Sequence, residues 1–345
     1  MIKVRILTND FHTFHPYVKS FHQLYERGIQ IVQPTDKEYD ITLVGHSLFQ
    51  DKKIGSLEKS TEMGLDYLSK IDGPYILVDG QDSHSMIGSF EVFKESDALF
   101  MLKHSLLKDR NLYNEPWVGG RYYWGKSEDY GIVEQNYKPE NFNDYSDRIH
   151  LSGTNWIGVP ELQWPDYTKI EKFFDVSAMF QHPHPECHEF ELQPSQDFYY
   201  NEHRQPVLDM LKCSDFMVAK LYKGRRVPSD KYFKYIQLSK VILAPFGYGE
   251  MAPRDLESAQ IGSILIKPDM SHVDTYPNIY VEDETYIPCK HDYSDLEQKI
   301  EYAVENFEEL QHKFVNNLKN RYIQEYHPYY LADYTEKLFK EQNLL

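Results

Sequence analysis

The segment SKVILAPFGYGEMAPRDLESAQIGSILIKP occupies residues 239–268 and reads as a strand, a loop, a helix and a second strand. Residues 241–244 form a short apolar run, as expected of a buried parallel strand. Gly247 and Gly249 follow it, and glycines allow a sharp turn and a close approach of the backbone to a ligand. The segment therefore predicts a βαβ unit whose glycine-containing loop lies before the helix.

The helix of this unit is predicted over residues 254–260. Pro253 suits the first helical position, and Gly262 is a typical helix end. The next strand is expected over residues 263–266, with Pro268 after it. A helix N-terminus presents free N–H groups and the positive end of its dipole, which favours an anion there. A plain crossover, in which the glycines only make the turn, is the alternative.

Two side chains in the first turns of this helix suit a nucleotide. Arg254 and Glu257 are three residues apart and can share a face of the helix. The Glu257 carboxylate could accept both hydroxyls of a ribose, and Arg254 could meet a phosphate. In open α/β sheets, ligands bind at the carboxyl ends of the strands, where this loop is expected.

The same residues carry a family resemblance. The segment resembles the donor-site segment of GT-B nucleotide-sugar glycosyltransferases, especially the exostosin-like and spore-coat-like groups. Those groups have a Ser-Lys strand, a Pro-x-Gly loop, an Arg-x-x-Glu helix, a glycine and a hydrophobic strand that ends in proline. The resemblance covers residues 215–270. Ser258 departs from the pattern, and six residues separate Glu250 from Glu257 where many members have seven.

The resemblance implies an α/β protein of GT-B fold. Two Rossmann-like domains would face a cleft, and a C-terminal helix would cross back to the N-terminal domain. A length of 345 residues suits two domains. We expect an acceptor domain over residues 1–160, a nucleotide-sugar donor domain over 161–325 and the returning helix over 326–345.

The resemblance also implies a donor site that needs no metal or other cofactor. Glu257 would bind the ribose, while the glycine loop and Arg225 or Arg226 would stabilise the diphosphate, with Lys220 and Lys231 in reserve. The candidate donor-binding residues are Lys220, Arg225, Arg226, Lys231, Gly247, Tyr248, Gly249, Glu250, Arg254 and Glu257.

The charge distribution supports a local anion site within an acidic chain. The net charge is −17, which disfavours nucleic acid and anionic bilayers as partners. Residues 219–240 nevertheless hold seven basic residues and one acidic residue. This basic segment comes just before the glycine loop, although a solvated basic turn would have the same composition.

The N-terminal half alternates strands and helices, which predicts a parallel sheet. Strands are expected over residues 2–7, 29–32, 41–44, 75–78 and 98–102, and helices from Pro16 to Gly28 and over 57–71. Residues 8–15 are expected to form a loop after the first strand. In the second half, strands are expected over residues 176–180, 216–219 and 279–281, and amphipathic helices over 202–212, 232–238, 296–318 and 329–340.

Four residues at predicted strand ends are candidates for a catalytic base. His12 and His15 follow the first strand and could titrate near neutral pH. Asp79 and Asp82 follow the fourth strand and could activate an acceptor hydroxyl or hold sugar hydroxyls. Histidines satisfied within the loop and an Asp-Gly turn are the alternatives. A base is required if the enzyme inverts the anomeric centre.

The sequence gives weaker evidence about a metal site and about the cellular compartment. His182, His184, Glu186, Cys187 and His188 could suggest zinc, but their spacing matches no familiar zinc motif. Three scattered cysteines indicate no disulfide framework. The first residues lack the apolar core of a signal peptide, and no run is long enough to span a membrane, so we expect a cytoplasmic protein.

We therefore predict a hexosyl- or related transferase that moves a sugar from a nucleotide-diphosphate sugar to a hydroxyl acceptor, in glycan or surface polysaccharide synthesis. A nucleotide-dependent dehydrogenase is disfavoured because the first strand–helix turn has no glycine fingerprint. A non-catalytic nucleotide-sugar or glycan-binding protein on the same fold is the alternative. The sequence leaves the base, the sugar, the acceptor and the oligomeric state open. The aromatic segment 111–150 is interpreted as an insertion or as the wall of a cleft, on the acceptor side.

Overall fold

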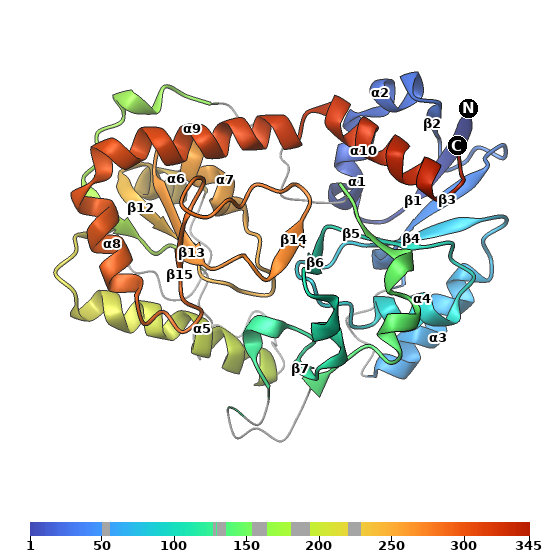
Figure 1. The fold of residues 1–345 in the computed structure, drawn as a ribbon, viewed down its shortest axis with the longest axis horizontal. Helices are drawn as coiled ribbons and strands as arrows, with labels where there is room; N and C mark the ends of the chain where they lie inside the picture. The colour runs from blue at the N-terminus through green and yellow to red at the C-terminus, as the bar shows by residue number, and fades with distance from the viewer. Residues whose placement is uncertain (50–55, 127–128, 130–135, 154–163, 181–193, 220–228) are drawn as a thin grey trace. The chain divides into compact units, whose positions relative to one another are not determined.

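A computed structural model describes residues 1–49, 56–126, 129, 136–153, 164–180, 194–219 and 229–345. The chain divides into two compact units (Figure 1). The first unit comprises Met1–Pro160, His272–Asn278 and Ile323–Leu345, and the second comprises Glu161–Ser271 and Ile279–Tyr322. The chain thus returns to the first unit twice, and each unit has its own parallel sheet.

The first unit is built on a parallel sheet. In the part of the chain that the structure describes, this sheet has six strands in the order β2-β1-β3-β4-β5-β9, and all neighbours are parallel. The order reverses between β1 and β3, which makes the carboxyl ends of these strands a topological switch point. The strands are β1 (Ile2–Leu7), β2 (Ile29–Val32), β3 (Ile41–Gly45), β4 (Tyr75–Asp79), β5 (Met101–Lys103) and β9 (Ile149–Leu151).

Helices cover both faces of this sheet, as apolar parallel strands require. On one face Phe14, Tyr17, Leu24 and Phe339 pack against β1, β3 and β4. These side chains come from α1 (Phe11–Lys19), α2 (Phe21–Glu26) and α10 (Pro328–Glu341). On the other face lies α3 (Leu57–Leu68), which packs on α4 (Ser89–Glu95) (Figure 1).

The first helix begins earlier than the sequence predicts. Residues 11–15 are helical, although a start at Pro16 and a loop over residues 8–15 are expected. Asp10 is the reason, because its carboxylate accepts hydrogen bonds from the His12 N–H at 3.0 Å and the Thr13 hydroxyl at 2.7 Å. This N-cap, together with the burial of Phe14, outweighs the hydrogen bond that proline removes.

The second unit repeats the same architecture. Among its described residues the sheet has five strands in the order β11-β10-β12-β13-β15, again all parallel. Its order reverses between β10 and β12, so the switch point lies there. The strands are β10 (Phe174–Ser177), β11 (Val218–Ala219), β12 (Ser239–Leu243), β13 (Ile264–Pro268) and β15 (Ile287–Cys289).

The strands of this sheet direct alternate side chains to opposite faces. Val241 and Leu243 of β12 join a core with α5, α8 and α9, whereas Ile242 packs beside Ile236 of α6. Helix α7 follows the glycine loop. The helices are α5 (Pro194–Cys213), α6 (Ser229–Gln237), α7 (Pro253–Gln260), α8 (Leu296–Glu305) and α9 (Phe307–Glu325).

Several predicted elements need correction. Residues 279–281 form no strand; instead Ile287–Cys289 pairs with β13, and β14 (Val273–Thr275) pairs antiparallel with β6 (Ser105–Leu107) of the first unit. The predicted strands over residues 98–102 and 176–180 are displaced to Met101–Lys103 and Phe174–Ser177. The helix expected over residues 296–318 is two helices, α8 and α9, which meet at Asn306.

The aromatic segment 111–150 also contains regular structure that its sequence pattern does not reveal. Its strand β7 (Trp117–Val118) pairs antiparallel with β8 (Asn136–Tyr137), and β9 extends the main sheet. Short 3-10 helices connect the larger elements: η1 (His46–Leu48), η2 (Arg110–Asn114), η3 (Tyr122–Trp124), η5 (Phe142–Asp144), η6 (Ser146–Arg148) and η7 (Tyr167–Lys169).

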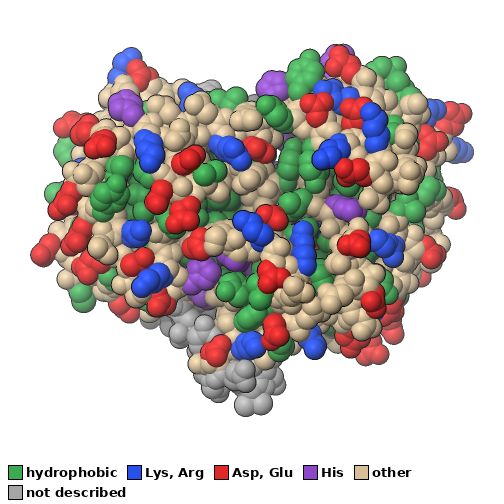
Figure 2. Space-filling view, in the orientation of Figure 1, with side chains coloured by type: hydrophobic (Ala, Val, Ile, Leu, Met, Phe, Trp, Pro, Cys, Tyr) green, Lys and Arg blue, Asp and Glu red, His purple; other side chains and the backbone are tan. Residues whose placement is uncertain are grey.

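The surface is charged, and its charges are mixed. On the face drawn in Figure 2, Asp and Glu side chains are interspersed with Lys and Arg side chains. Within the described ranges, none of the helices combines the length and the hydropathy that crossing a bilayer requires.

Candidate functional site

The glycine loop of the second unit lies at the switch point of its sheet. It follows β12, one of the two strands between which the order reverses, and it leads into α7. Pro253 takes a first-turn position of α7, and Gly262, with a φ of +70°, follows its C-cap, so both predicted helix signals are confirmed. The loop therefore occupies the position where doubly wound sheets bind ligands.

A buried ion pair anchors the start of α7 to the sheet. Lys267 of β13 and Asp255 in the first turn of α7 are fully buried, and their charged atoms lie 2.6 Å apart. The same carboxylate oxygen, Asp255 Oδ2, accepts hydrogen bonds from the Tyr280 hydroxyl at 2.6 Å and the Ala252 N–H at 3.0 Å. Three donors thus hold one oxygen and fix the N-terminus of the helix.

The same lysine holds the glycine loop. Lys267 Nζ also donates to the backbone carbonyl of Glu250 at 2.7 Å. Burial lowers the pKa of Lys267, while the charge and hydrogen bond of Asp255 oppose that shift. At the other end of the loop, the buried Arg204 donates to the carbonyl of Phe246 at 3.4 Å. Both contacts hold the backbone of the loop.

Glu257 lies one turn further along α7 in a different environment. Its carboxylate accepts a hydrogen bond of 2.6 Å from the hydroxyl of Tyr232, which belongs to α6. Arg254 lies near enough to both groups to interact with them electrostatically. The Nε of Arg254 is buried, and within the described part of the chain it has no hydrogen-bond partner. These three side chains are all half-buried.

The environment makes ionised Glu257 costly to the folded state. Burial raises the pKa of the Glu257 carboxyl, and the hydrogen bond from Tyr232 and the charge of Arg254 only partly offset this effect. Burial likewise raises the pKa of Tyr232, so its hydroxyl keeps the proton that it donates. Three donors thus hold Asp255 Oδ2, whereas burial disfavours the ionised form of Glu257, as is common for residues of binding sites.

The remaining candidates for donor binding divide into two groups. Gly247, Tyr248 and Gly249 are half-buried in the loop, Glu250 is buried, and Lys231 is exposed on α6. Lys220, Arg225 and Arg226, and also the histidine-rich segment 182–188, lie outside the described residues. The structure thus brings Glu257 and Arg254 together at the start of α7, beside the glycine loop.

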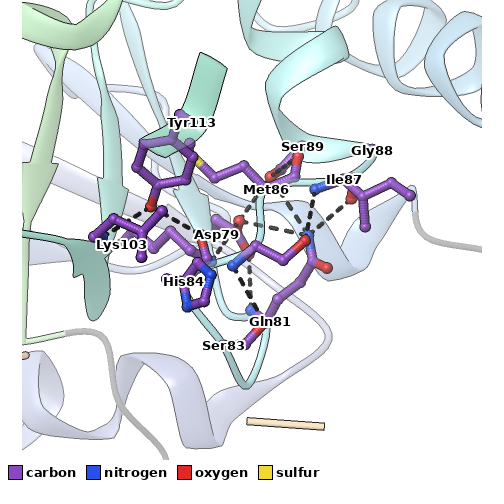
Figure 3. A network of polar contacts seen from close by, with 12 residues as sticks. Asp79, Gln81, Ser83, His84, Met86, Ile87, Gly88, Ser89, Lys103 and Tyr113 are labelled. Atoms are coloured by element: carbon purple, nitrogen blue, oxygen red, sulfur yellow. Dashed lines mark hydrogen bonds and ion pairs between the residues drawn. The ribbon is translucent and has the colours of Figure 1, made fainter. Parts of the chain in front are cut away.

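In the first unit, Asp79 is the centre of a buried polar network (Figure 3). Its Oδ2 atom lies 2.9 Å from Lys103 Nζ and accepts a hydrogen bond of 2.6 Å from the hydroxyl of Ser89. Its Oδ1 accepts the N–H of Gln81 at 2.8 Å. Asp79 and Lys103 are both fully buried. The network joins the ends of β4 and β5 to the first turn of α4.

This network gives Asp79 a structural role. Burial alone would raise the pKa of the Asp79 carboxyl, but the charges of Lys103 and His46 and the hydrogen bonds outweigh burial, and the pKa is lowered. A fully buried carboxylate with three donors is poorly placed to take a proton from a substrate in solvent. The geometry thus does not favour the predicted catalytic role of Asp79.

The other three candidate bases are more accessible. Asp82 is exposed in the loop after β4, His12 is exposed on α1, and His15 is half-buried on the same helix. A Cβ atom on Gly80 would lie 2.5 Å from the Thr13 hydroxyl oxygen, so the loop after β4 and the first turn of α1 are in close contact. Asp82 and His12 thus belong to adjoining segments at the carboxyl edge of the sheet.

Sequence reasoning did not identify four residues that shape these sites. Lys103 is the last residue of β5 and Lys267 the penultimate residue of β13, and a lysine in a buried strand signals a buried counter-charge. Tyr232 and Tyr280 each donate to a carboxylate of α7, and no local pattern indicates these contacts.

Comparisons with known proteins identify the fold. No protein-family model matches the chain, and no curated protein matches it. Among solved structures, HepE of Anabaena in complex with UDP is similar over 99% of this chain and 100% of its own, with 9% identity and a TM-score of 0.50. Sucrose-phosphate synthase of Thermosynechococcus elongatus covers 99% of both chains, with 10% identity and a TM-score of 0.52. The chain has the GT-B fold.

The GT-B fold agrees with the expected fold class. Two Rossmann-like units with parallel sheets and a C-terminal helix that packs on the first sheet are the observed features. At 9–10% identity these likenesses concern the fold, so the activity has to be argued from the residues of this chain.

Proposed function

We propose that the protein is a glycosyltransferase that transfers a sugar from a nucleotide-diphosphate sugar to a hydroxyl acceptor. The observation that carries this proposal is the arrangement at the second switch point. There the glycine loop leads into α7, and Glu257 and Arg254 lie together on the first turns of that helix. A carboxylate for ribose hydroxyls and a cation for phosphate are the groups that a nucleotide diphosphate requires.

Uridine is the first base to test. HepE, which shares the fold, was solved in complex with UDP. In our proposal Glu257 binds the ribose, and Arg254, Lys231 and the N–H groups at the start of α7 face the diphosphate. Lys220, Arg225 and Arg226 are further candidates for the diphosphate. Cationic side chains would stabilise the charge that develops on the leaving group, so no metal is required.

The reaction forms one bond and breaks one. An acceptor hydroxyl oxygen attacks the anomeric carbon of the sugar, and the bond from that carbon to the diphosphate oxygen breaks. The diphosphate leaves with the electron pair, and the acceptor proton passes to a base. Asp82, His12 and His15 of the first unit are the accessible candidates for that base.

Release of nucleotide diphosphate tests the proposal. The purified protein would be incubated with UDP-sugars and a panel of saccharide acceptors, and free UDP would be measured over time. Glu257→Ala should lower turnover by about 100-fold or more, because a charged hydrogen-bond acceptor at the donor is lost. Release of UDP by the wild-type protein with no effect of Glu257→Ala would contradict the assigned donor site. Binding of UDP-sugar without any release would favour the non-catalytic alternative.

A further inference from the structure

Two tyrosines donate to the two carboxylates of α7 in closely matched ways. Tyr232 of α6 donates to Glu257, and Tyr280 donates to Asp255, each at an oxygen–oxygen distance of 2.6 Å. Both tyrosines are half-buried. In Figure 1, α6 and α7 lie side by side in the second unit, as the first of these hydrogen bonds requires.

The two carboxylates differ in what else holds them. The Oδ2 atom of Asp255 is also bonded to Lys267 and to the N–H of Ala252, so the Tyr280 hydroxyl is one donor of three. Glu257 is held differently among the described residues: its Oε2 atom accepts a hydrogen bond from the hydroxyl of Tyr232, and Arg254 acts on it through its charge. Tyr232 therefore has a larger share in the orientation of its carboxylate than Tyr280 has.

We propose that Tyr232 is a positioning residue that sets the selectivity of this site for ribose. The proposal rests on the proposed function, in which Glu257 binds ribose hydroxyls. By holding Oε2, Tyr232 would restrict the rotation of the carboxylate and so orient Oε1 for a ribose hydroxyl. The same hydrogen bond favours the ionised form of Glu257 and so opposes the effect of burial on its pKa, and an ionised carboxylate accepts two hydroxyl protons where a protonated one offers a donor instead.

Selectivity follows from this geometry. A site built to accept a hydrogen bond from a sugar hydroxyl discriminates against an analogue that lacks the hydroxyl, because a buried polar group is then left unpaired. A hydrogen bond to a charged group corresponds to about a tenfold to hundredfold difference in affinity. Without the Tyr232 hydroxyl, Glu257 can rotate and protonate, and we expect this preference to fall by about tenfold.

Calorimetric titration with UDP, 2′-deoxy-UDP and 3′-deoxy-UDP tests the proposal. The variants are Tyr232→Phe, which removes only the hydroxyl, and Tyr280→Phe as its matched control. The wild-type protein should prefer UDP over at least one deoxy analogue by about tenfold or more. Tyr232→Phe should reduce that ratio, and a lower pH should reduce it further. Tyr280→Phe should lower the melting temperature but leave the ratio unchanged.

The outcomes separate the inference from the proposed function. If Tyr232→Phe lowers the melting temperature while the ratio of UDP to deoxy-UDP affinity stays at the wild-type value, the hydroxyl is merely structural and the inference is wrong. If the ratio falls equally in Tyr232→Phe and Tyr280→Phe, selectivity depends on α7 as a whole and the inference is also wrong. If the wild-type protein binds no ribonucleoside diphosphate, the proposed function fails and the inference fails with it.

Discussion

The two carboxylates of α7 should respond in opposite ways to loss of their charge. In Asp255→Asn the ammonium of Lys267, which is fully buried, loses its counter-charge. Removal of one partner from a buried ion pair typically costs about 3–5 kcal/mol. The Tyr280 hydroxyl and the Ala252 N–H lose a charged acceptor at the same oxygen, so we expect the upper part of this range.

Glu257→Gln should behave differently because burial raises the pKa of Glu257. A raised pKa means that the folded protein binds a proton more tightly than the unfolded chain does. This proton binding stabilises the folded state fully below a pH of about 4.5, the pKa of Glu257 in the unfolded chain. The stabilisation is lost as the pH rises through the pKa of Glu257 in the folded protein. Glutamine removes this loss, so the variant should be at least as stable as the wild-type protein at pH 7.5. Its advantage should shrink toward pH 4.5.

Hydrogen exchange measured by mass spectrometry would report this difference locally, because unfolding of a chain with two units is not two-state. Peptides from α7 and β13 should exchange more than about 1,000-fold faster in Asp255→Asn, as a loss of more than about 4 kcal/mol implies. Glu257→Gln should exchange at the wild-type rate. If both substitutions accelerate exchange equally, or if Asp255→Asn does not accelerate it, the distinction between a structural and a ligand-binding carboxylate is wrong.

Three further predictions concern single positions. Burial lowers the pKa of Lys172 to about 7, so as the pH rises the folded protein loses that proton before the unfolded chain does. The melting temperature should therefore rise between pH 7 and 10.5, and Lys172→Met should make this rise smaller. Gly262 has a φ of +70°, and a methyl group added there would lie 2.5 Å from a tyrosine Cβ, so Gly262→Ala should lower the free energy of unfolding by more than about 2 kcal/mol. Gly73 has a similar φ of +77° but nothing within 4 Å of the added methyl, so Gly73→Ala should lower it less in the same denaturant titration. Asp79→Asn breaks the buried ion pair with Lys103 and should lower the free energy of unfolding by about 3–5 kcal/mol, while turnover per folded molecule should stay within about threefold of the wild-type value. A large loss of turnover at an unchanged melting temperature would instead show that Asp79 is catalytic.

Local sequence signals located most of the sheet. The bounds of β1 and β2 were predicted to the residue, because alternating apolar residues and the glycine at position 28 mark them. The end of α7 was predicted to the residue and its start to within one residue, because a proline marks the start and a glycine follows the end. The start of α1 was misplaced because the proline signal at Pro16 was given more weight than the capping side chain of Asp10.

Long-range pairing could not be predicted in the same way. The strand Ile287–Cys289 is short, and its partner β13 lies some twenty residues earlier in the chain, so no local period marks it. β14 joins the first unit although it follows the donor segment, and this return is a property of the fold and not of its local sequence.

The candidate site was predicted in outline and not in its supporting contacts. The loop, Arg254 and Glu257 were identified from spacing along one helix, where residues three apart share a face. The contacts of Tyr232 and Lys267 were not, because they join elements that only the folded chain brings together. Asp79 was predicted as a candidate base, and its burial and its ion pair could not be predicted from the local sequence because they depend on β5 and α4.

The central claim is that the second unit binds a nucleotide diphosphate at the glycine loop and the start of α7. Thermal-shift measurement with UDP and the other nucleoside diphosphates, with and without a divalent chelator, tests it most directly, because a ligand that binds only the folded state raises the melting temperature. We predict stabilisation by one nucleoside diphosphate that persists in the chelator and is lost in Glu257→Ala. Stabilisation that disappears with the chelator would contradict metal-independent binding, and no response to any nucleotide would contradict the claim itself.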